Sequence, residues 1–106
     1  MNIHPSLLPN YPGLNTHARA LADGAMEHGA TVHFVTTKLD GGPHIVQERV
    51  TVQPGDTPAS LARRVQQIEH KIYPRAIGWF ADGRLYMKDN LAFLDDIPIN
   101  TRQGTS

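Results

Sequence analysis

The chain has 106 residues with ten basic and ten acidic side chains, so its formal net charge is zero. This length allows one domain with a modest core. The balanced charge argues against nucleic acid or an anionic membrane surface as the main partner. No apolar run approaches the roughly 20 residues that span a bilayer. The absence of cysteine excludes disulfides, thiolate metal sites and a cysteine nucleophile, and it suits a cytoplasmic protein.

The first elements are predicted to be a loop and a short helix. Residues 1–15 read as an ordered loop because three prolines restrict the backbone. Thr16 is suited to cap a helix over residues 17–23 that ends at Gly24. The apolar residues that this helix should bury are Ala18, Leu21 and Ala22.

Two strands and a long helix are predicted next. Small, β-branched and aromatic residues alternate over residues 30–35 and again over 44–52, which is typical of strands. Because the connection between them is short, we expect them to pair antiparallel. A helix should follow from Pro58 to about Phe80, capped by Asp56 or Thr57, with an apolar stripe of Leu61, Val65, Ile68 and Ile72.

The end of the chain is predicted to be a hairpin and a tail. Pro74 should kink the long helix or begin a new segment. Residues 84–87 and 91–94 then read as a small hairpin, and residues 95–106 as a loose polar tail. The predicted fold class is α/β, with two central strands covered by a long helix, in one domain over residues 1–94.

Asn2 and His4 form the most informative local pattern. His4 precedes Pro5, so its backbone should be extended, and positions i and i+2 of an extended segment face the same way. Both side chains can therefore point at one reacting carbonyl. The amide can donate a hydrogen bond to a developing oxyanion, and the imidazole can change protonation near neutral pH. Taken alone, the same residues also fit a plain loop histidine and a turn asparagine.

Longer motifs extend this pattern over most of the chain. They comprise residues 2–9 (NIHPSLLP), 11–17 (YPGLNTH), 28–35 (HGATVHFV), 39–43 (LDGGP) and 69–74 (EHKIYP). Together they resemble the formyltetrahydrofolate-dependent formyltransferases, and the second motif is typical of the branch that formylates glycinamide ribonucleotide in purine biosynthesis. The resemblance implies a Rossmann-like fold and a 10-formyltetrahydrofolate cosubstrate.

The resemblance also implies roles for individual residues. The catalytic Asn, His and Asp of the family correspond to Asn2, His4 and Asp40, and Asp40 beside His4 would raise the pKa of the imidazole. The folate-contacting residues correspond to Asn2, Thr36, Thr37, Lys38, Leu39 and Asp40. The helical stretch facing the ribonucleotide corresponds to Gln66, Gln67, Ile68 and Glu69, where Glu69 could accept hydrogen bonds from ribose hydroxyls. The alternatives from the residues alone are a surface loop and a solvated helix face.

The family's enzymes are about twice this length, and no glycine-rich phosphate loop is present here. We therefore interpret the chain as the C-terminal half of such an enzyme, because the matching region begins at Asn2. The expected partner is the missing N-terminal half or a second copy of the chain, docking where Val32, Phe34, Val46 and the long helix would be uncovered. The alternatives are a non-catalytic complementation or oligomerisation fragment, and a related formyltransferase or formyl hydrolase with another acceptor.

A metal site is not expected. The histidines other than His4 form no i, i+4 pair and no cysteine joins them. His33, inside the first predicted strand, should instead be packed or hydrogen-bonded beneath the site.

Overall fold

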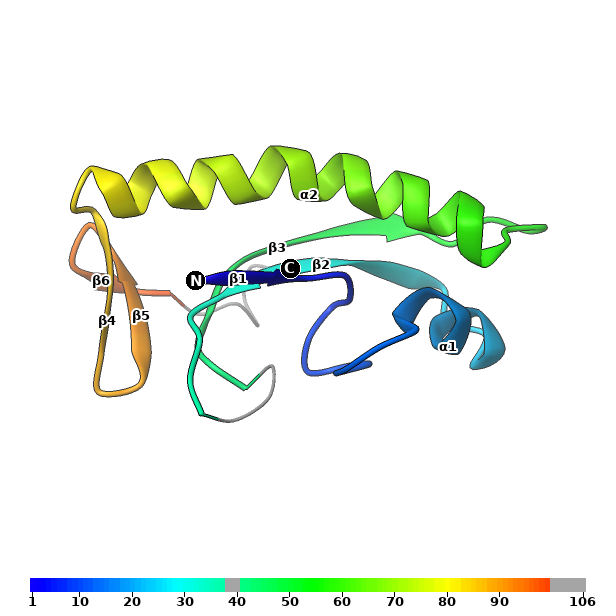
Figure 1. Cartoon of the computed structure of the whole chain (residues 1–106), viewed down its shortest axis with the longest axis horizontal. Coiled ribbons are helices and arrows are strands. Elements are labelled where there is room, and N and C mark those ends of the chain that lie inside the picture. The colour runs from blue at the N-terminus through cyan, green and yellow to red at the C-terminus, as the bar shows by residue number, and fades with distance from the viewer. Residues whose placement is uncertain (38–40, 100–106) are drawn as a thin grey trace.

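The computed structural model describes residues 1–37 and 41–99. A three-stranded antiparallel sheet, β1–β2–β3, packs under a long helix, and a second small sheet, β4–β5–β6, follows that helix at one end (Figure 1). The elements in chain order are β1 (Asn2–His4), α1 (Thr16–Ala22), β2 (Glu27–His33), β3 (His44–Thr51), α2 (Pro58–Ala81), β4 (Leu85–Lys88), β5 (Leu91–Leu94) and β6 (Ile97–Pro98). The α/β class is as predicted.

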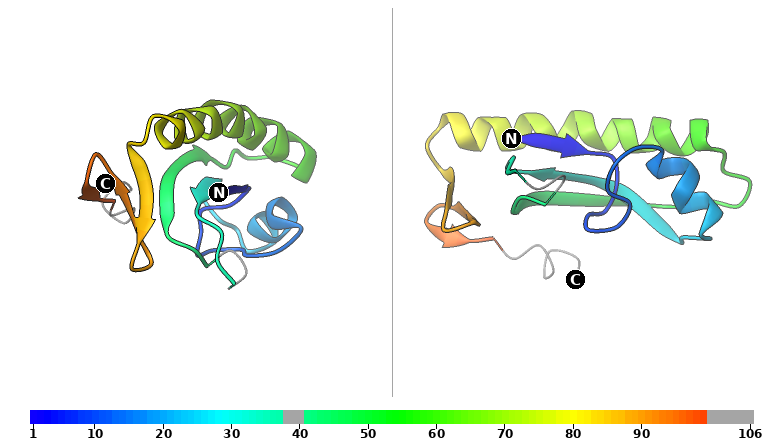
Figure 2. Two further views of the ribbon diagram at one scale, coloured as in Figure 1. Left: turned by 60° about the vertical axis from the view of Figure 1, so that its left-hand side comes forward. Right: turned by 60° about the horizontal axis from the view of Figure 1, so that its bottom comes forward.

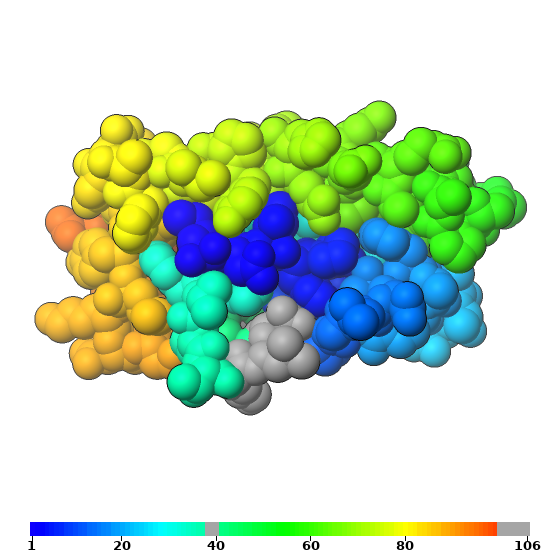
Figure 3. Space-filling model, in the orientation of Figure 1, coloured from blue at the N-terminus to red at the C-terminus, as the bar shows by residue number. Residues whose placement is uncertain are grey.

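The first strand corrects the prediction of a loop over residues 1–15. Asn2 lies opposite His33, and His4 lies opposite Thr31, in an antiparallel ladder with β2. Pro5 favours the extended backbone at His4, and the ladder then satisfies backbone polar groups that a loop would leave to water. The sheet order places β1 at one edge. Figure 3 shows this N-terminal segment crossing the visible face of the molecule below α2.

The second strand begins and ends earlier than predicted. It spans Glu27–His33, whereas Val35 lies beyond its end and is 58% exposed. Gly29 permits the early start, because a Cβ there would collide with the carbonyl oxygen of Glu48 and would lie 2.9 Å from the Cα of Arg49. β3 pairs antiparallel with β2, which is the arrangement expected for the two central strands.

The long helix α2 begins with a reciprocal cap. Thr57 accepts a hydrogen bond from the backbone N–H of Ser60, whose side chain accepts from the N–H of Thr57. The helix continues through Pro74 to Ala81 (Figures 1 and 2), so of the two possibilities predicted for Pro74, a kink or a new segment, the new segment is wrong. Pro74 is exposed, so the carbonyl that loses its helical partner can bond water. Within residues 1–37 and 41–99 no helix is long and apolar enough to cross a membrane.

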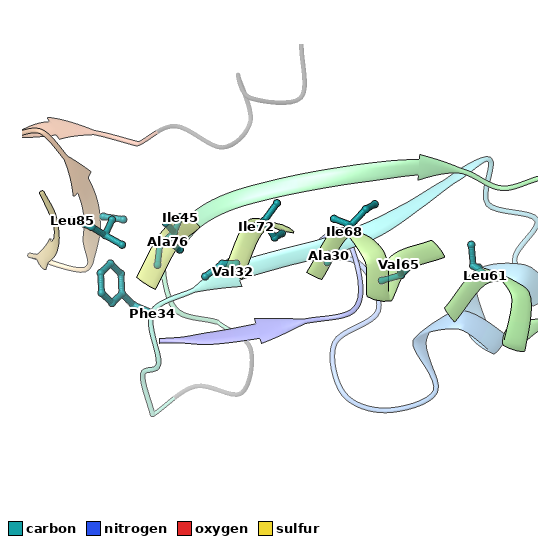
Figure 4. Packing of buried hydrophobic residues seen from close by; sticks show 11 residues of the cluster. Ala30, Val32, Phe34, Ile45, Leu61, Val65, Ile68, Ile72, Ala76 and Leu85 are labelled. Carbon is teal, nitrogen blue, oxygen red and sulfur yellow. The ribbon is translucent and has the colours of Figure 1, made fainter. Parts of the chain in front are cut away.

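The core lies between α2 and one face of the sheet (Figure 4). The predicted apolar stripe of α2 is buried there, and Val32 and Phe34 are also buried, at 0% and 7% exposure. The prediction that Val32 and Phe34 would be uncovered is therefore wrong, and Val46 is half-buried. The core residues are Ala30, Val32, Phe34, Ile45, Leu61, Val65, Ile68, Ile72, Ala76, Leu85 and Ala92.

The short helix α1 buries a different face from the one predicted. Ala20 is fully buried and Leu21 is half-buried, whereas Ala18 and Ala22 are exposed. Thr16 is the first helical residue rather than the cap, and its hydroxyl donates to the carbonyl of Pro5 at 2.6 Å. The contact with the preceding loop, which sequence periodicity does not contain, sets the orientation of α1.

The hairpin is confirmed as two paired strands, with Asp89 and Asn90 at positive φ in its turn. Leu85 and Ala92 attach it to the core, both 2% exposed. The predicted loose tail is partly wrong, because residues 97–98 form β6 against β5. Residues 100–106 lie outside the described part of the chain.

Candidate active site

Asn2 and His4 lie on the same face of β1, as the extended backbone predicted. Their cross-strand neighbours on β2 are His33 and Thr31, which share that face. This face points away from α2, because Ile3 and Val32 between them belong to the α2 side of the sheet. Asn2 is exposed, whereas His4 is only 7% exposed. The amide is thus accessible to a ligand beside a largely enclosed imidazole.

The ring of His4 is fixed by the loop that follows β1. Its Nε2 lies 2.9 Å from the carbonyl oxygen of Tyr11. The backbone N–H of Ser6 bonds back to the carbonyl of His4 at 2.9 Å, so the chain turns directly after the histidine. The imidazole therefore has a defined orientation relative to β1.

A buried polar network holds this loop against the sheet. The hydroxyl of Thr31 donates to the carbonyl of Ser6 at 2.8 Å and accepts from the N–H of Leu8 at 3.1 Å. The amide of Gln47 donates both to Thr31 Oγ1 at 2.9 Å and to the carbonyl of Leu8 at 2.7 Å. Thr31 is fully buried, so its hydroxyl cannot bond to water. These hydrogen bonds satisfy the buried polar groups instead. Neither Thr31 nor Gln47 stood out in the sequence, since the network depends on strand register.

The predicted folate loop begins beside Asn2, at the end of β2. Thr36 is half-buried and Thr37 is exposed, whereas Lys38, Leu39 and Asp40 lie outside the described residues. A hydrogen bond of 3.0 Å from the N–H of Phe34 to the carbonyl of Pro43 joins the two ends of the loop. The loop therefore emerges from the sheet next to the exposed amide of Asn2.

The predicted ribonucleotide-facing stretch is divided around α2. Ile68 belongs to the core and is 8% exposed, so its side chain faces the sheet rather than a ligand. Gln67 lines an open groove on the β3 side together with Glu48 and Lys71, and Gln66 is exposed. Four consecutive helical residues cover the whole circumference, so they cannot all face one ligand through side chains.

Glu69 is the member of that stretch with an environment suited to a site. Burial raises the pKa of its carboxyl above the ordinary value, and the nearby imidazoles of His70 and His4 oppose that rise. Tyr73, one turn further along α2, donates to the carbonyl of Met1 at 3.2 Å, so Glu69 lies on the β1 side of α2. Gln67 lies on the β3 side instead.

Two histidines that the sequence did not connect form a pair beneath the loop. His17 Nδ1 and His28 Nε2 lie 3.2 Å apart, with the rings perpendicular. Burial lowers the pKa of His28 to about 4, and the charges of His17 and His4 contribute; burial also lowers the pKa of His17. His33 is packed as predicted, and its Nδ1 donates to the carbonyl of Phe34. In the part of the chain that is described, no three His, Asp or Glu side chains group as metal ligands.

The His28 environment predicts a loss of stability in acid. An unfolded His28 binds a proton near its ordinary pKa of 6.5, whereas the folded chain binds it only near 4. Stability should therefore fall as pH drops from about 6.5 towards 4, by up to about 3 kcal/mol in the free energy of unfolding. Urea denaturation between pH 7.5 and 4.5 should show this slope, reduced in His28→Asn. The same slope in His28→Asn would contradict the assignment, and His70→Asn, at an exposed position of α2, is the matched control.

The chain is similar to known formyltransferases. Residues 1–77 match the family model for formyl transferase. The chain is 60% identical over 95 residues to the phosphoribosylglycinamide formyltransferase of Escherichia coli (strain K12), covering 90% of this chain and 45% of that protein. It matches the structure of phosphoribosylglycinamide formyltransferase from Coxiella burnetii with a TM-score of 0.88 at 56% identity, covering 93% and 46%. A formyltetrahydrofolate deformylase from Pseudomonas syringae pv. tomato is similar at 32% identity and a TM-score of 0.82, covering 88% and 31%.

The chain matches only part of the length of its relatives. The chain spans just under half the length of the E. coli and Haemophilus influenzae relatives, 45% in each case. These comparisons do not support the prediction that this share is the C-terminal half.

Proposed function

The chain belongs to the formyl transferase family, and from this premise we propose that it supplies the formyl-transfer residues of a phosphoribosylglycinamide formyltransferase. The observation that carries the proposal is the placement of Asn2 and His4 on one face of β1, in a chain 60% identical to the E. coli relative. The reaction would transfer a formyl group from 10-formyltetrahydrofolate to the amine of glycinamide ribonucleotide.

His4 and Asn2 would act on the formyl carbonyl. When the amine nitrogen attacks the formyl carbon, a C–N bond forms and the carbonyl electron pair moves onto oxygen. A protonated His4 would stabilise that oxygen and give it a proton, while the exposed Asn2 amide donates a second hydrogen bond. Collapse of the intermediate breaks the bond to the folate nitrogen, which takes up the proton released by the amine.

The donor and acceptor would approach from different elements. The folate would lie along the loop that contains Thr36, Thr37, Lys38, Leu39 and Asp40, whose start is beside Asn2. Asp40 would place a negative charge that favours a protonated imidazole in the transition state. Glu69, on the β1 side of α2, would accept hydrogen bonds from ribose hydroxyls of the acceptor. Gln66 and Gln67 would contribute less to binding of the acceptor. Both are exposed, and Gln67 lines the groove on the β3 side of α2.

A hydrolase is the first alternative. Asn2 and His4 would stabilise the same oxyanion if water attacked, and the similarity to a formyltetrahydrofolate deformylase supports this possibility. A related formyltransferase acting on another amine would use these residues in the same way.

A complementation or oligomerisation role is the second alternative. β1 is one of the two edge strands of its sheet, and the apolar side chains Val35, Ile77 and Phe80 are 58%, 47% and 54% exposed. Exposed edges and apolar surface favour pairing with another chain. Such a partner would be the part of the enzyme that this chain does not cover, or a second copy.

A reconstitution assay distinguishes the three readings. The chain should be mixed with a separately made segment comprising the part of the E. coli relative that it does not match. We expect formylation of glycinamide ribonucleotide in the mixture, with weak or no activity from the chain alone because donor and acceptor each lose contacts. Other amines and water are tested side by side as acceptors.

Each outcome has a defined meaning. Preferential release of formate would support the hydrolase, and preferential formylation of another amine would support a different transferase. Formation of a complex in which neither reaction occurs would leave only the complementation role. Full turnover by the chain as a monomer would contradict the need for a partner.

A further inference from the structure

Tyr11 has a backbone conformation that needs an explanation. Its φ is 54°, in the left-handed region that bulky side chains rarely adopt. Such a conformation is strained and persists only where surrounding contacts enforce it. Glycine adopts a positive φ without strain, and Gly13 does so two residues later. The positive φ of Tyr11 is the strained one in this turn.

The side chain of Tyr11 is held by three contacts from other elements. Its hydroxyl donates to Asp23 Oδ2 at 2.9 Å, just after α1. The guanidinium carbon of Arg19, on α1, lies 5.6 Å from the ring centroid, and the ring of His28, on β2, makes an edge contact at 6.1 Å. These contacts anchor the strained residue to α1 and to the sheet.

The anchored backbone fixes one proton of His4. The Tyr11 carbonyl lies 2.9 Å from His4 Nε2, and a carbonyl oxygen can only accept a hydrogen bond. Nε2 therefore carries hydrogen whether the ring is neutral or charged. In the neutral ring, the other nitrogen, Nδ1, is then the basic one.

We propose that Tyr11 is a positioning residue whose carbonyl keeps the Nε2 proton of His4 in place, so that Nδ1 is the nitrogen that exchanges a proton during formyl transfer. The catalytic part rests on the proposed function. As the C–N bond forms, the Nδ1 proton passes to the developing oxyanion, and it returns to Nδ1 when that oxygen re-forms its double bond. The Nε2–H bond to Tyr11 is neither made nor broken in these steps.

The tautomer can be measured without any activity. In the ¹⁵N-labelled chain, long-range ¹H–¹⁵N spectra of the neutral histidine rings should show His4 protonated at Nε2. Its Nε2 proton should also be protected from exchange with water, because it is hydrogen-bonded and His4 is 7% exposed. Observation of a neutral His4 protonated at Nδ1 would overturn the proposal.

Two variants test the anchor. Tyr11→Ala removes the ring and hydroxyl contacts and should abolish the protection, whereas Tyr11→Phe removes only the bond to Asp23 and should reduce it. Tyr86→Phe is the matched control, because its hydroxyl makes a similar bond to Asp96 in the distant hairpin. If Tyr11→Ala does not fold, Tyr11→Phe decides, and unchanged protection in it would overturn the proposal.

Kinetics of the reconstituted enzyme complete the test. Misplacement of a catalytic group costs up to about 100-fold, so Tyr11→Ala should lower kcat by that order with a smaller change in KM. An increase in KM alone would contradict a positioning role for His4. Absence of formyl transfer in the unmodified complex, together with a protected Nε2 proton, would refute the proposed function and leave the role of Tyr11 in fixing the tautomer intact.

Discussion

Replacement of His4 by alanine should lower formyl transfer in the reconstituted enzyme by about 10²–10⁴-fold, the range of a positioned acid or base. The imidazole is the only titratable side chain that β1 presents on the face shared with Asn2. Its loss would leave the oxyanion with the Asn2 amide alone. Single-turnover measurement of the formylated product gives the change in the chemical step directly.

His4→Gln separates proton chemistry from packing. The glutamine amide retains an N–H donor for the Tyr11 carbonyl but cannot exchange a proton near neutral pH. We expect activity to fall about as far in His4→Gln as in the alanine variant, with a smaller loss in the free energy of unfolding. Nearly full activity in either variant would refute the catalytic role of His4.

Replacement of Ile72 by alanine should have the largest effect on stability. Ile72 belongs to the α2 stripe and is fully buried, facing the sheet. Truncation of a buried isoleucine removes packing and leaves a cavity, at a cost of about 2–5 kcal/mol. This is a large fraction of the roughly 5–15 kcal/mol that stabilises a typical domain. Denaturant unfolding monitored by circular dichroism measures the loss.

Ile77→Ala is the matched control for this prediction. Ile77 is on the same helix with the same side chain, but it is 47% exposed. Both variants replace isoleucine by alanine, which is the better helix former, so the change in helix propensity is the same in each. In the isolated chain, Ile77→Ala should cost less than about 1 kcal/mol. Equal losses in the two variants would show that the core is not where the structure places it.

The elements with strong local signals could be predicted from the sequence. The α2 stripe repeats at three- and four-residue steps, and Thr57 and Pro58 mark its start. The hairpin has two short strand patterns around Asp89 and Asn90. The extended backbone at His4 follows from Pro5. These features depend on residues that are neighbours in the sequence, so their spacing carries the information.

The bounds of β2 and the buried face of α1 could not be predicted in this way. β2 runs from Glu27 because β3 pairs with it from that residue onward, with Gly29 accommodating the close approach of β3. α1 turns Ala20 inward because Thr16 bonds to the loop after β1. Partners distant in the sequence provide these contacts, and they override weak local preferences.

Some features of the candidate site could likewise be predicted from the sequence, and others could not. The sequence by itself determined the residue types, the common direction of Asn2 and His4, and the resemblance that named Asp40 and Glu69. Only the tertiary structure decided that Tyr11 contacts His4, that His17 and His28 pair, and that Ile68 faces the core. The physical reason is that a dipeptide spacing fixes local backbone direction, whereas strand register and helix docking decide which distant polar groups meet.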